Sequence, residues 1–214
     1  MALFQERRDA GRRLAEALAD WRGTDAVAVG IARGGVPVAA EVARVLGLPL
    51  SAVAVRKLGV PGHEEYAWGA IADGVRVVRD EAVRQLPAAP RELLAIEERE
   101  RIVLGQRNTL LAGAASVAGR PAIVIDDGIA TGATAEAACR AVRARGASRV
   151  ILAAPVAPAS WRPRADVADE WVCPYPQADF WAVGAFYTDF TQTDDAEVVR
   201  LLSRADPGVA TPEG

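Results

Sequence analysis

Short runs of apolar residues alternate along this chain with stretches of helical pattern, and this alternation restricts the fold more than any other feature. The runs cover residues 26–31, 50–55, 122–127, 149–156 and 170–173. Four of them are nearly continuous, as expected of strands that are buried on both faces of a parallel sheet. Helical stretches lie between them, at about residues 36–46, 91–112, 133–145 and 158–165. This order predicts an α/β fold with a five-stranded open parallel sheet and helices on both faces.

One segment departs from the alternation. Between Gly69 and Val83, the dipeptide Asp73-Gly74 separates two short runs that favour strands. An Asp-Gly pair in that setting is the strongest short-range signal for a hairpin. We therefore expect a short antiparallel excursion from the parallel sheet.

The length of the chain, 214 residues, suits one well-buried α/β core and is short for two independent domains. No linker rich in Pro, Gly and Ser divides it. We expect a single domain over residues 1–206, with an amphipathic helix at 5–20. The segment 174–206 is expected to form a small appendage, and residues 207–214 a flexible tail.

Composition and charge exclude several classes of partner. The net charge of −3 creates no positive field that would attract a nucleic-acid backbone. No window reaches the roughly 18 to 20 uninterrupted apolar residues of a membrane span, and the N-terminal stretch lacks the apolar core of a signal peptide. We expect a cytoplasmic protein with neither nucleic acid nor membrane as a partner.

The residues that follow the third apolar run have the composition of a phosphate-binding loop. The carboxylates of Asp126 and Asp127 are followed by Gly128, Ile129, Ala130, Thr131, Gly132, Ala133 and Thr134. In a parallel sheet, ligands bind beyond the carboxyl ends of the strands. Glycines let backbone N–H groups approach an anion, threonines add hydroxyl donors, and the helix that follows presents its positive end.

The two acids need a separate explanation, because carboxylates repel phosphate. Asp126 and Asp127 are suited to vicinal hydroxyls or to a divalent cation, and a phosphorylated sugar would use both. The alternative is a tight glycine turn with aspartate helix caps. That alternative does not require both acids together with the Thr-Gly-x-Thr pattern.

Two further loops carry cations. Arg33 lies with Gly34 and Gly35 in a glycine-rich turn after the first run, which is either a structural turn or a second phosphate site. Arg56 and Lys57 end the second run, and the Pro/Gly-rich loop after them suits a mobile lid. A solvated surface pair is the alternative for these two cations.

These residues resemble the signature of the type I phosphoribosyltransferases. The match is close over residues 122–134, AIVIDDGIATGAT, and extends more loosely over about 26–190. In that family the acids and the loop bind the ribose and 5′-phosphate of phosphoribosyl pyrophosphate. The resemblance implies that Asp126 and Asp127 bind ribose and Mg²⁺, and that Gly128–Thr134 bind the 5′-phosphate.

The same resemblance assigns the other two loops. Ala32–Gly35 would hold the pyrophosphate, with a cis peptide bond between Ala32 and Arg33. The loop that starts at Arg56 and Lys57 would close over the site. Its stretch VRKLGVPG, residues 55–62, is similar to one in the adenine phosphoribosyltransferases.

The acceptor side resembles the purine-salvage enzymes. The segment FWAVGAFYTDF, residues 180–190, is similar to their hood, in which an aromatic ring stacks on the base. That position falls on Trp181, with Phe180 beside it.

One position departs from the hypoxanthine and guanine enzymes. They carry a third acid in the phosphate loop, where this chain has Ala130. An acceptor nitrogen would find no carboxylate there, and Glu65 and Asp73 are the candidate proton acceptors instead.

The resemblance implies a Mg²⁺-dependent transfer of the phosphoribosyl group to a nitrogenous base, as in nucleotide salvage. Arg33 and Lys57 would stabilise the departing pyrophosphate, while Asp127 would help to fix the ribose. A homodimer is compatible with this interpretation.

Two alternatives remain. One is a regulatory protein that senses phosphoribosyl pyrophosphate without turnover, against which stand the acidic net charge and the Arg56-Lys57 pair. The other is a hydrolase or phosphorylase of a phosphorylated sugar.

Overall fold

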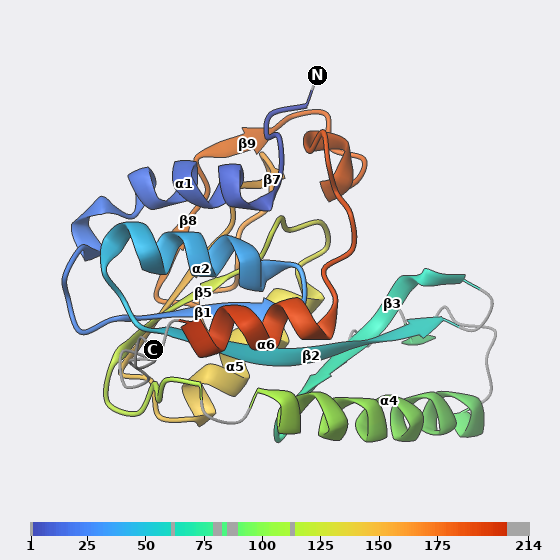
Figure 1. Cartoon of the computed structure of the whole chain (residues 1–214). Coiled ribbons are helices and arrows are strands. Elements are labelled where there is room, and N and C mark those ends of the chain that lie inside the picture. The colour runs from blue at the N-terminus through green and yellow to red at the C-terminus, as the bar shows by residue number, and fades with distance from the viewer. Residues whose placement is uncertain (1, 61–62, 79–82, 85–89, 112–113, 205–214) are drawn as a thin grey trace.

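Seven strands form one sheet in the order β4-β3-β2-β1-β5-β6-β8 (Figure 1). The computed structural model describes residues 2–60, 63–78, 83–84, 90–111 and 114–204. Five strands are parallel: β2 Leu50–Val60, β1 Val27–Ala32, β5 Pro121–Ile125, β6 Arg149–Ala153 and β8 Glu170–Val172. The predicted five-stranded parallel core is confirmed.

The antiparallel excursion is also present. Strands β3, His63–Ala72, and β4, Val75–Val78, add to the free edge of β2 in antiparallel register. The turn between them is Asp73-Gly74, and Gly74 has a φ of 67°, which favours glycine. The hairpin predicted from this dipeptide is therefore correct.

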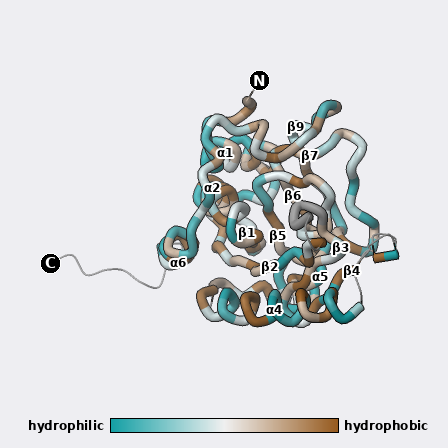
Figure 2. Tube along the Cα trace, turned by 90° about the vertical axis from the view of Figure 1, so that its right-hand side faces the viewer, coloured by the Kyte–Doolittle hydropathy of each residue, from teal (hydrophilic) through white to brown (hydrophobic). Residues whose placement is uncertain are grey.

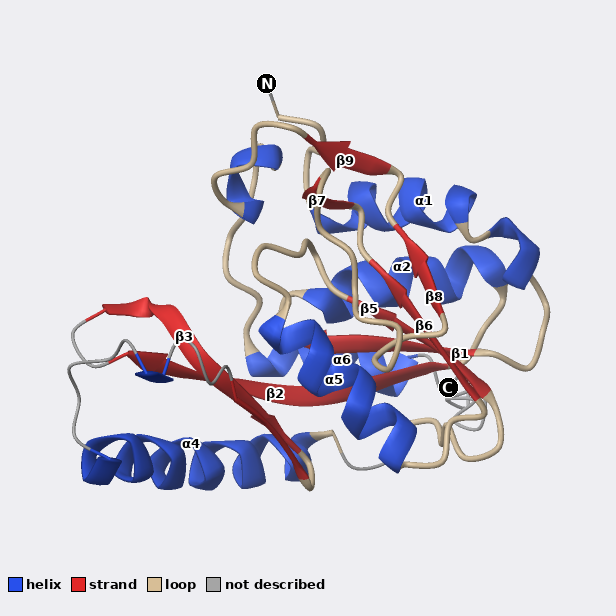
Figure 3. Cartoon of the chain, turned by 180° about the vertical axis from the view of Figure 1, so that it is seen from behind, coloured by secondary structure: helices blue, strands red, loops and turns tan. Residues whose placement is uncertain are grey.

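Helices cover both faces of the sheet (Figures 1 and 2). The α-helices are α1 Arg7–Ala17, α2 Gly35–Leu46, α4 Pro90–Leu110, α5 Ala133–Ala144 and α6 Asp195–Arg204. Helices α1, α2 and α6 share an apolar cluster with one face, built around Ile123, Ile125 and Ile151. Helix α5 packs on the opposite face, against Val29, Val53 and Val124 (Figure 3). Helix α4 lies under the extended part of β2 and β3.

A second, two-stranded parallel sheet lies beside the first. It consists of β7, Val156–Pro158, and β9, Tyr175–Gln177. The short 3-10 helix η2, Val183–Phe186, follows it and packs with Phe4 from the N-terminal segment. We call β7, β9 and residues 180–190 the hood.

One predicted helix and several predicted boundaries are wrong. No helix forms at 158–165, because Pro158 and Pro163 remove backbone donors there. The predicted strand 149–156 stops at Ala153, and its last residue belongs to β7. The N-terminal helix is shorter than 5–20, since α1 ends at Ala17 and a 3-10 turn, Ala19–Trp21, follows.

The C-terminal segment has two parts. Its first part belongs to the hood, but α6 returns to the main sheet and contacts α2. The predicted flexible tail, 207–214, lies outside the described residues. None of the helices in the described part of the chain is both long and apolar enough to cross a membrane.

Candidate active site at the carboxyl edge of the sheet

Two glycine-rich loops meet where β1 and β5 end. The strands are parallel neighbours, with Gly30 opposite Ile125, so the loops that follow them emerge side by side. A Cβ atom on Gly35 would overlap the carbonyl oxygen of Ile125, and one on Gly34 would overlap a carboxylate oxygen of Asp127. These glycines are required because the loops approach so closely.

The loop after β1 has the backbone feature that the family resemblance implied, but its arginine side chain points elsewhere. The peptide bond between Ala32 and Arg33 is cis, as expected. The guanidinium of Arg33, however, lies 3.8 Å from the carboxylate of Asp195 at the start of α6. The side chain of Arg33 therefore points toward α6, whereas the backbone at Gly34 lies against the carboxylate of Asp127.

The loop after β5 leads into the N-terminus of α5. Gly132 precedes the helix with a φ of 83°, and no side chain caps the helix there. The hydroxyl Oγ1 of Thr134 is buried and has no hydrogen-bond partner among the residues that the structure describes. Unpaired donors at a helix N-terminus are the groups that bind an anion.

Hood residues and a tryptophan enclose this loop. Gly128 lies against Val183, and a Cβ atom there would be 2.5 Å from the valine side chain. The indole of Trp161 covers Gly132 and packs edge-on against Trp171, with ring centroids 5.0 Å apart. The loop is thus held in place from both sides, and Ala130 and Thr131 stay exposed.

Burial raises the pKa values of the carboxyl groups of Asp126 and Asp127. It raises the pKa of Asp126 to about 8, and the neighbouring charge of Asp127 adds to the effect. Burial also raises the pKa of Asp127, where the guanidinium of Arg7 opposes it. Near neutral pH the ligand-free pair therefore carries less than its full negative charge.

The comparisons with known proteins agree with this geometry. A model of the phosphoribosyl transferase domain matches residues 3–191. This chain belongs to the phosphoribosyl transferase family. A Mycobacterium tuberculosis H37Rv protein, provisionally named as a phosphoribosyl transferase, is 49% identical over 210 residues, which are 96% of this chain and 47% of that protein. The same values hold for its counterpart in strain CDC 1551. The chain thus spans about half the length of the curated relatives that it matches.

A solved structure has a similar fold. The crystal structure of TT1426 from Thermus thermophilus is 41% identical, with a TM-score of 0.72. The match covers 95% of this chain and 99% of that one. The fold is the type I phosphoribosyltransferase fold.

Arg56 and Lys57 do not end their strand, contrary to the prediction from the sequence. Strand β2 continues past both to Val60, so Arg56 and Lys57 are inside the strand and point to opposite faces. Arg56 binds the carboxylate of Glu100 on α4, with Nη2 and Oε2 2.6 Å apart. Lys57 is exposed on the opposite face of β2 from Arg56, and its charge lowers the pKa of Asp126.

Of the two candidate proton acceptors, Asp73 and Glu65, the structure describes the side chain of Asp73 alone. The carboxylate of Asp73 lies 3.8 Å from the guanidinium of Arg145, which follows the last residue of α5. The glycine-rich loop after β5 is at the other end of that 12-residue helix. At 1.5 Å per residue the two ends are about 18 Å apart, so Asp73 is not at the site. The side chain of Glu65 and the loop residues 61–62 lie outside the described part of the chain.

The two neighbouring aromatic residues of the hood, Phe180 and Trp181, have different surroundings. Trp181 is 91% exposed, as a stacking surface for a base would be. Phe180 packs against Phe186, with ring centroids 5.2 Å apart, and supports the hood.

Two residues at the acids escaped the sequence analysis. The Nε of Arg7 donates to Oδ2 of Asp127 over 2.8 Å, and the hydroxyl of Tyr187 donates to the Asp127 carbonyl over 2.5 Å. Tyr187 belongs to the hood segment that resembled the family. Arg7 is one of several arginines in the first helix, and nothing in the sequence distinguishes it.

Proposed function

We propose that this chain transfers the phosphoribosyl group of phosphoribosyl pyrophosphate to a nitrogenous base and releases pyrophosphate. The observation that carries the proposal is the meeting of two glycine-rich loops at one sheet edge, with a carboxyl pair between them. A ligand with phosphate groups at both ends and hydroxyls in the middle has matching chemistry. The proposal extends the family membership to a reaction.

The loop after β5 would bind the 5′-phosphate. Its support is the uncapped N-terminus of α5 and the unpartnered hydroxyl of Thr134. Asp126 would accept hydrogen bonds from the ribose hydroxyls, since its side chain is bound only by the Asp127 amide, at 3.0 Å, among the hydrogen bonds of the described residues.

The loop after β1 would bind the pyrophosphate through backbone amides, and Lys57 would approach it from β2. As the bond from the anomeric carbon to the pyrophosphate oxygen breaks, the electron pair leaves with pyrophosphate. The base nitrogen forms the new bond to that carbon and gives up its proton. Ala130 offers no acceptor for this proton, so Glu65 stays the candidate acceptor. Lys57 would act on the charge that develops on the leaving group, where a fixed cation has its largest effect.

The carboxyl groups at the site fit Mg²⁺ only as an ion that the substrate helps to hold. No group of three or more His, Cys, Asp or Glu side chains that could hold a metal occurs among the described residues. Asp126 and Asp127 are the candidate protein ligands, and Mg²⁺ commonly keeps water and phosphate oxygens as its other ligands. Bound there, it would neutralise charge on the pyrophosphate.

Trp181 would provide the surface on which the base stacks, and other contacts would select the base. A single domain over residues 1–206, a cytoplasmic location and a homodimer stay predictions.

The test is release of pyrophosphate from phosphoribosyl pyrophosphate and Mg²⁺ with a panel of purine and pyrimidine bases. We expect release that depends on one or a few bases and falls strongly in Asp126→Asn. Tight substrate binding without release for any base would favour the regulatory alternative. Release that needs no base would favour the hydrolase.

A further inference from the structure

Arg7 reaches the junction of the two phosphate loops from outside both of them. Its Nε binds the carboxylate of Asp127, and its Nη1 donates to the carbonyl of Thr191 over 2.7 Å. The guanidinium also lies 4.0 Å from the centroid of the Phe190 ring. The side chain is 11% exposed, so these contacts are largely shielded from water.

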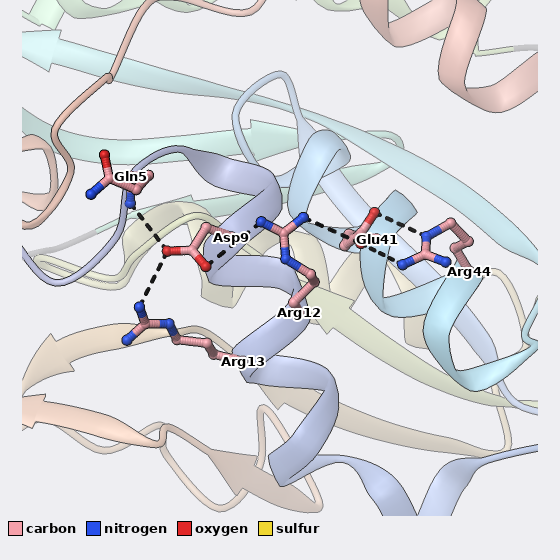
Figure 4. Close-up of polar contacts among 6 residues, drawn as sticks. All are labelled: Gln5, Asp9, Arg12, Arg13, Glu41 and Arg44. Atoms are coloured by element: carbon pink, nitrogen blue, oxygen red, sulfur yellow. Dashed lines mark hydrogen bonds and ion pairs between the residues drawn. The ribbon is translucent and has the colours of Figure 1, made fainter.

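Helix α1 is fixed firmly enough to hold this arginine in place. Gly11 lies where α1 crosses α2, and a Cβ atom there would come within 2.8 Å of the Val38 carbonyl oxygen. On the outer side, the guanidinium of Arg12 lies 3.7 Å from the carboxylate of Asp9 on the same helix and 3.7 Å from that of Glu41 on α2 (Figure 4). The helix therefore has little freedom to move along or away from α2.

The N-terminal segment is also tied to the hood. The amides of Leu3 and Phe4 donate to the carbonyl of Phe186, at 2.8 and 2.9 Å. The amide of Thr188 donates back to the Phe4 carbonyl at 2.8 Å. Arg7 is thus the point at which α1, the hood and the carboxyl edge of the sheet meet.

Asp127 is consequently held at both ends. Tyr187 binds its carbonyl, Arg7 binds its carboxylate, and that carboxylate lies against Gly34 of the first loop. The position of this side chain is therefore one of the two contacts that limit how closely the loops approach, the other being that of Gly35 with the Ile125 carbonyl. Asp126 is the less constrained of the two acids, because its carboxylate accepts only the hydrogen bond of the Asp127 amide among the described residues.

We propose that Arg7 is a positioning residue of the phosphoribosyl site, which acts through Asp127 to fix the spacing of the two phosphate loops. The inference rests on the proposed function and assigns to Arg7 a role that the family match does not. A guanidinium suits this position better than a lysine ammonium, which cannot contact the Asp127 carboxylate, the Thr191 carbonyl and the Phe190 ring face in the same way.

The experiment is a double-mutant cycle on Arg7 and Asp127, read as the affinity for phosphoribosyl pyrophosphate with Mg²⁺ by titration calorimetry. Arg7→Met should weaken binding about tenfold, and Arg7→Lys, which keeps the charge, should weaken it less. In an Asp127→Asn background, Arg7→Met should add no more than about a twofold loss, because its partner is already altered. Arg8→Met, an exposed arginine on the same helix, is the matched control and should bind as the wild type does.

Each outcome decides a separate question. Independent, additive losses would mean that Arg7 contacts the ligand directly, which would overturn the positioning role. Unchanged affinity in Arg7→Met would overturn the positioning role too. The thermal unfolding midpoints of Arg7→Met and of the milder variant Arg7→Lys, compared with that of the wild type, exclude misfolding as the cause of weaker binding. Absence of binding by the wild type would refute the proposed function and this role with it.

Discussion

Helix α1 buries small and apolar residues against the sheet layer, whereas the longer helix α4 buries two glutamates. On α1 the buried positions are Ala10, Gly11, Leu14 and Ala15. On α4 they are Glu97, Glu100 and Leu104. Helix α1 reaches the candidate site through Arg7, whereas α4 contacts β2 through the ion pair of Glu100 with Arg56.

The charges of α4 hold the antiparallel excursion. Glu97 binds Arg76 of β4 at 2.9 Å and Arg101 of its own helix at 2.5 Å. Large apolar side chains such as Leu94 and Ile102 remain mostly exposed on α4. The attachment of α1 should therefore depend mainly on close packing. That of α4 should depend on its ion pairs in addition to the apolar contacts of Leu104.

Truncation of an apolar side chain should separate the two helices most clearly. Leu14 of α1 is fully buried, and Leu14→Ala should reduce the free energy of unfolding by about 2 to 5 kcal/mol. Ile102 of α4 is 59% exposed, and Ile102→Ala should change it by less than about 0.5 kcal/mol. Denaturant unfolding measures both, and similar losses would refute the contrast.

Added methyl groups should have effects of opposite sign. Gly11→Ala would force α1 away from the Val38 carbonyl and should destabilise the chain by about 1 to 3 kcal/mol. Gly105 of α4 has open space around it, so Gly105→Ala should stabilise by about 0.5 to 1 kcal/mol through helix propensity. A loss at Gly105 would show that α4 is packed more tightly than this structure has it.

Removal of one charge should affect α4 in a specific way. Glu97→Gln leaves two arginines without their buried carboxylate and should cost about 1 to 2 kcal/mol, whereas the exposed Glu98→Gln should cost little. Equal effects of the two substitutions on the unfolding free energy would contradict attachment by charge.

The same pair has a defined pH dependence. Burial alone would raise the pKa of Glu97, but hydrogen bonds from Arg101 and Arg76 outweigh it and lower the pKa. The stabilisation is therefore complete above the ordinary value of 4.5 and is lost as the pH falls through the lowered folded value. The stability gap between wild type and Glu97→Gln should close over that acid range, and a constant gap would count against the ion pairs.

Local patterns in the sequence predict part of the fold, and contacts between distant segments determine the rest. Continuous apolar runs and the Asp73-Gly74 pair depend on local patterns, and they predicted the parallel core and the hairpin. No helix forms at 158–165, because Pro158 and Pro163 interrupt a pattern that is otherwise typical of a helix. The extension of β2 past Arg56 was missed, since pairing with β3 depends on residues far along the chain.

The candidate site was predictable where one segment contains it. The phosphate loop and its acids are contiguous, as are the hood residues around Trp181. Arg7 and Asp127 are 120 positions apart, and no local pattern connects them. The covering of Gly132 by Trp161 likewise depends on the tertiary fold.

The central claim is that the carboxyl edge of the sheet binds phosphoribosyl pyrophosphate, and the hydroxyl of Thr134 tests it most directly. Titration calorimetry should compare wild type, Thr134→Val and the matched Thr134→Ser, each with Mg²⁺. We predict that Thr134→Val keeps the thermal stability of the ligand-free chain, because this hydroxyl has no partner there among the described residues, but binds about tenfold more weakly. Thr134→Ser should bind nearly as the wild type does. Equal affinity of Thr134→Val and wild type would contradict the claim.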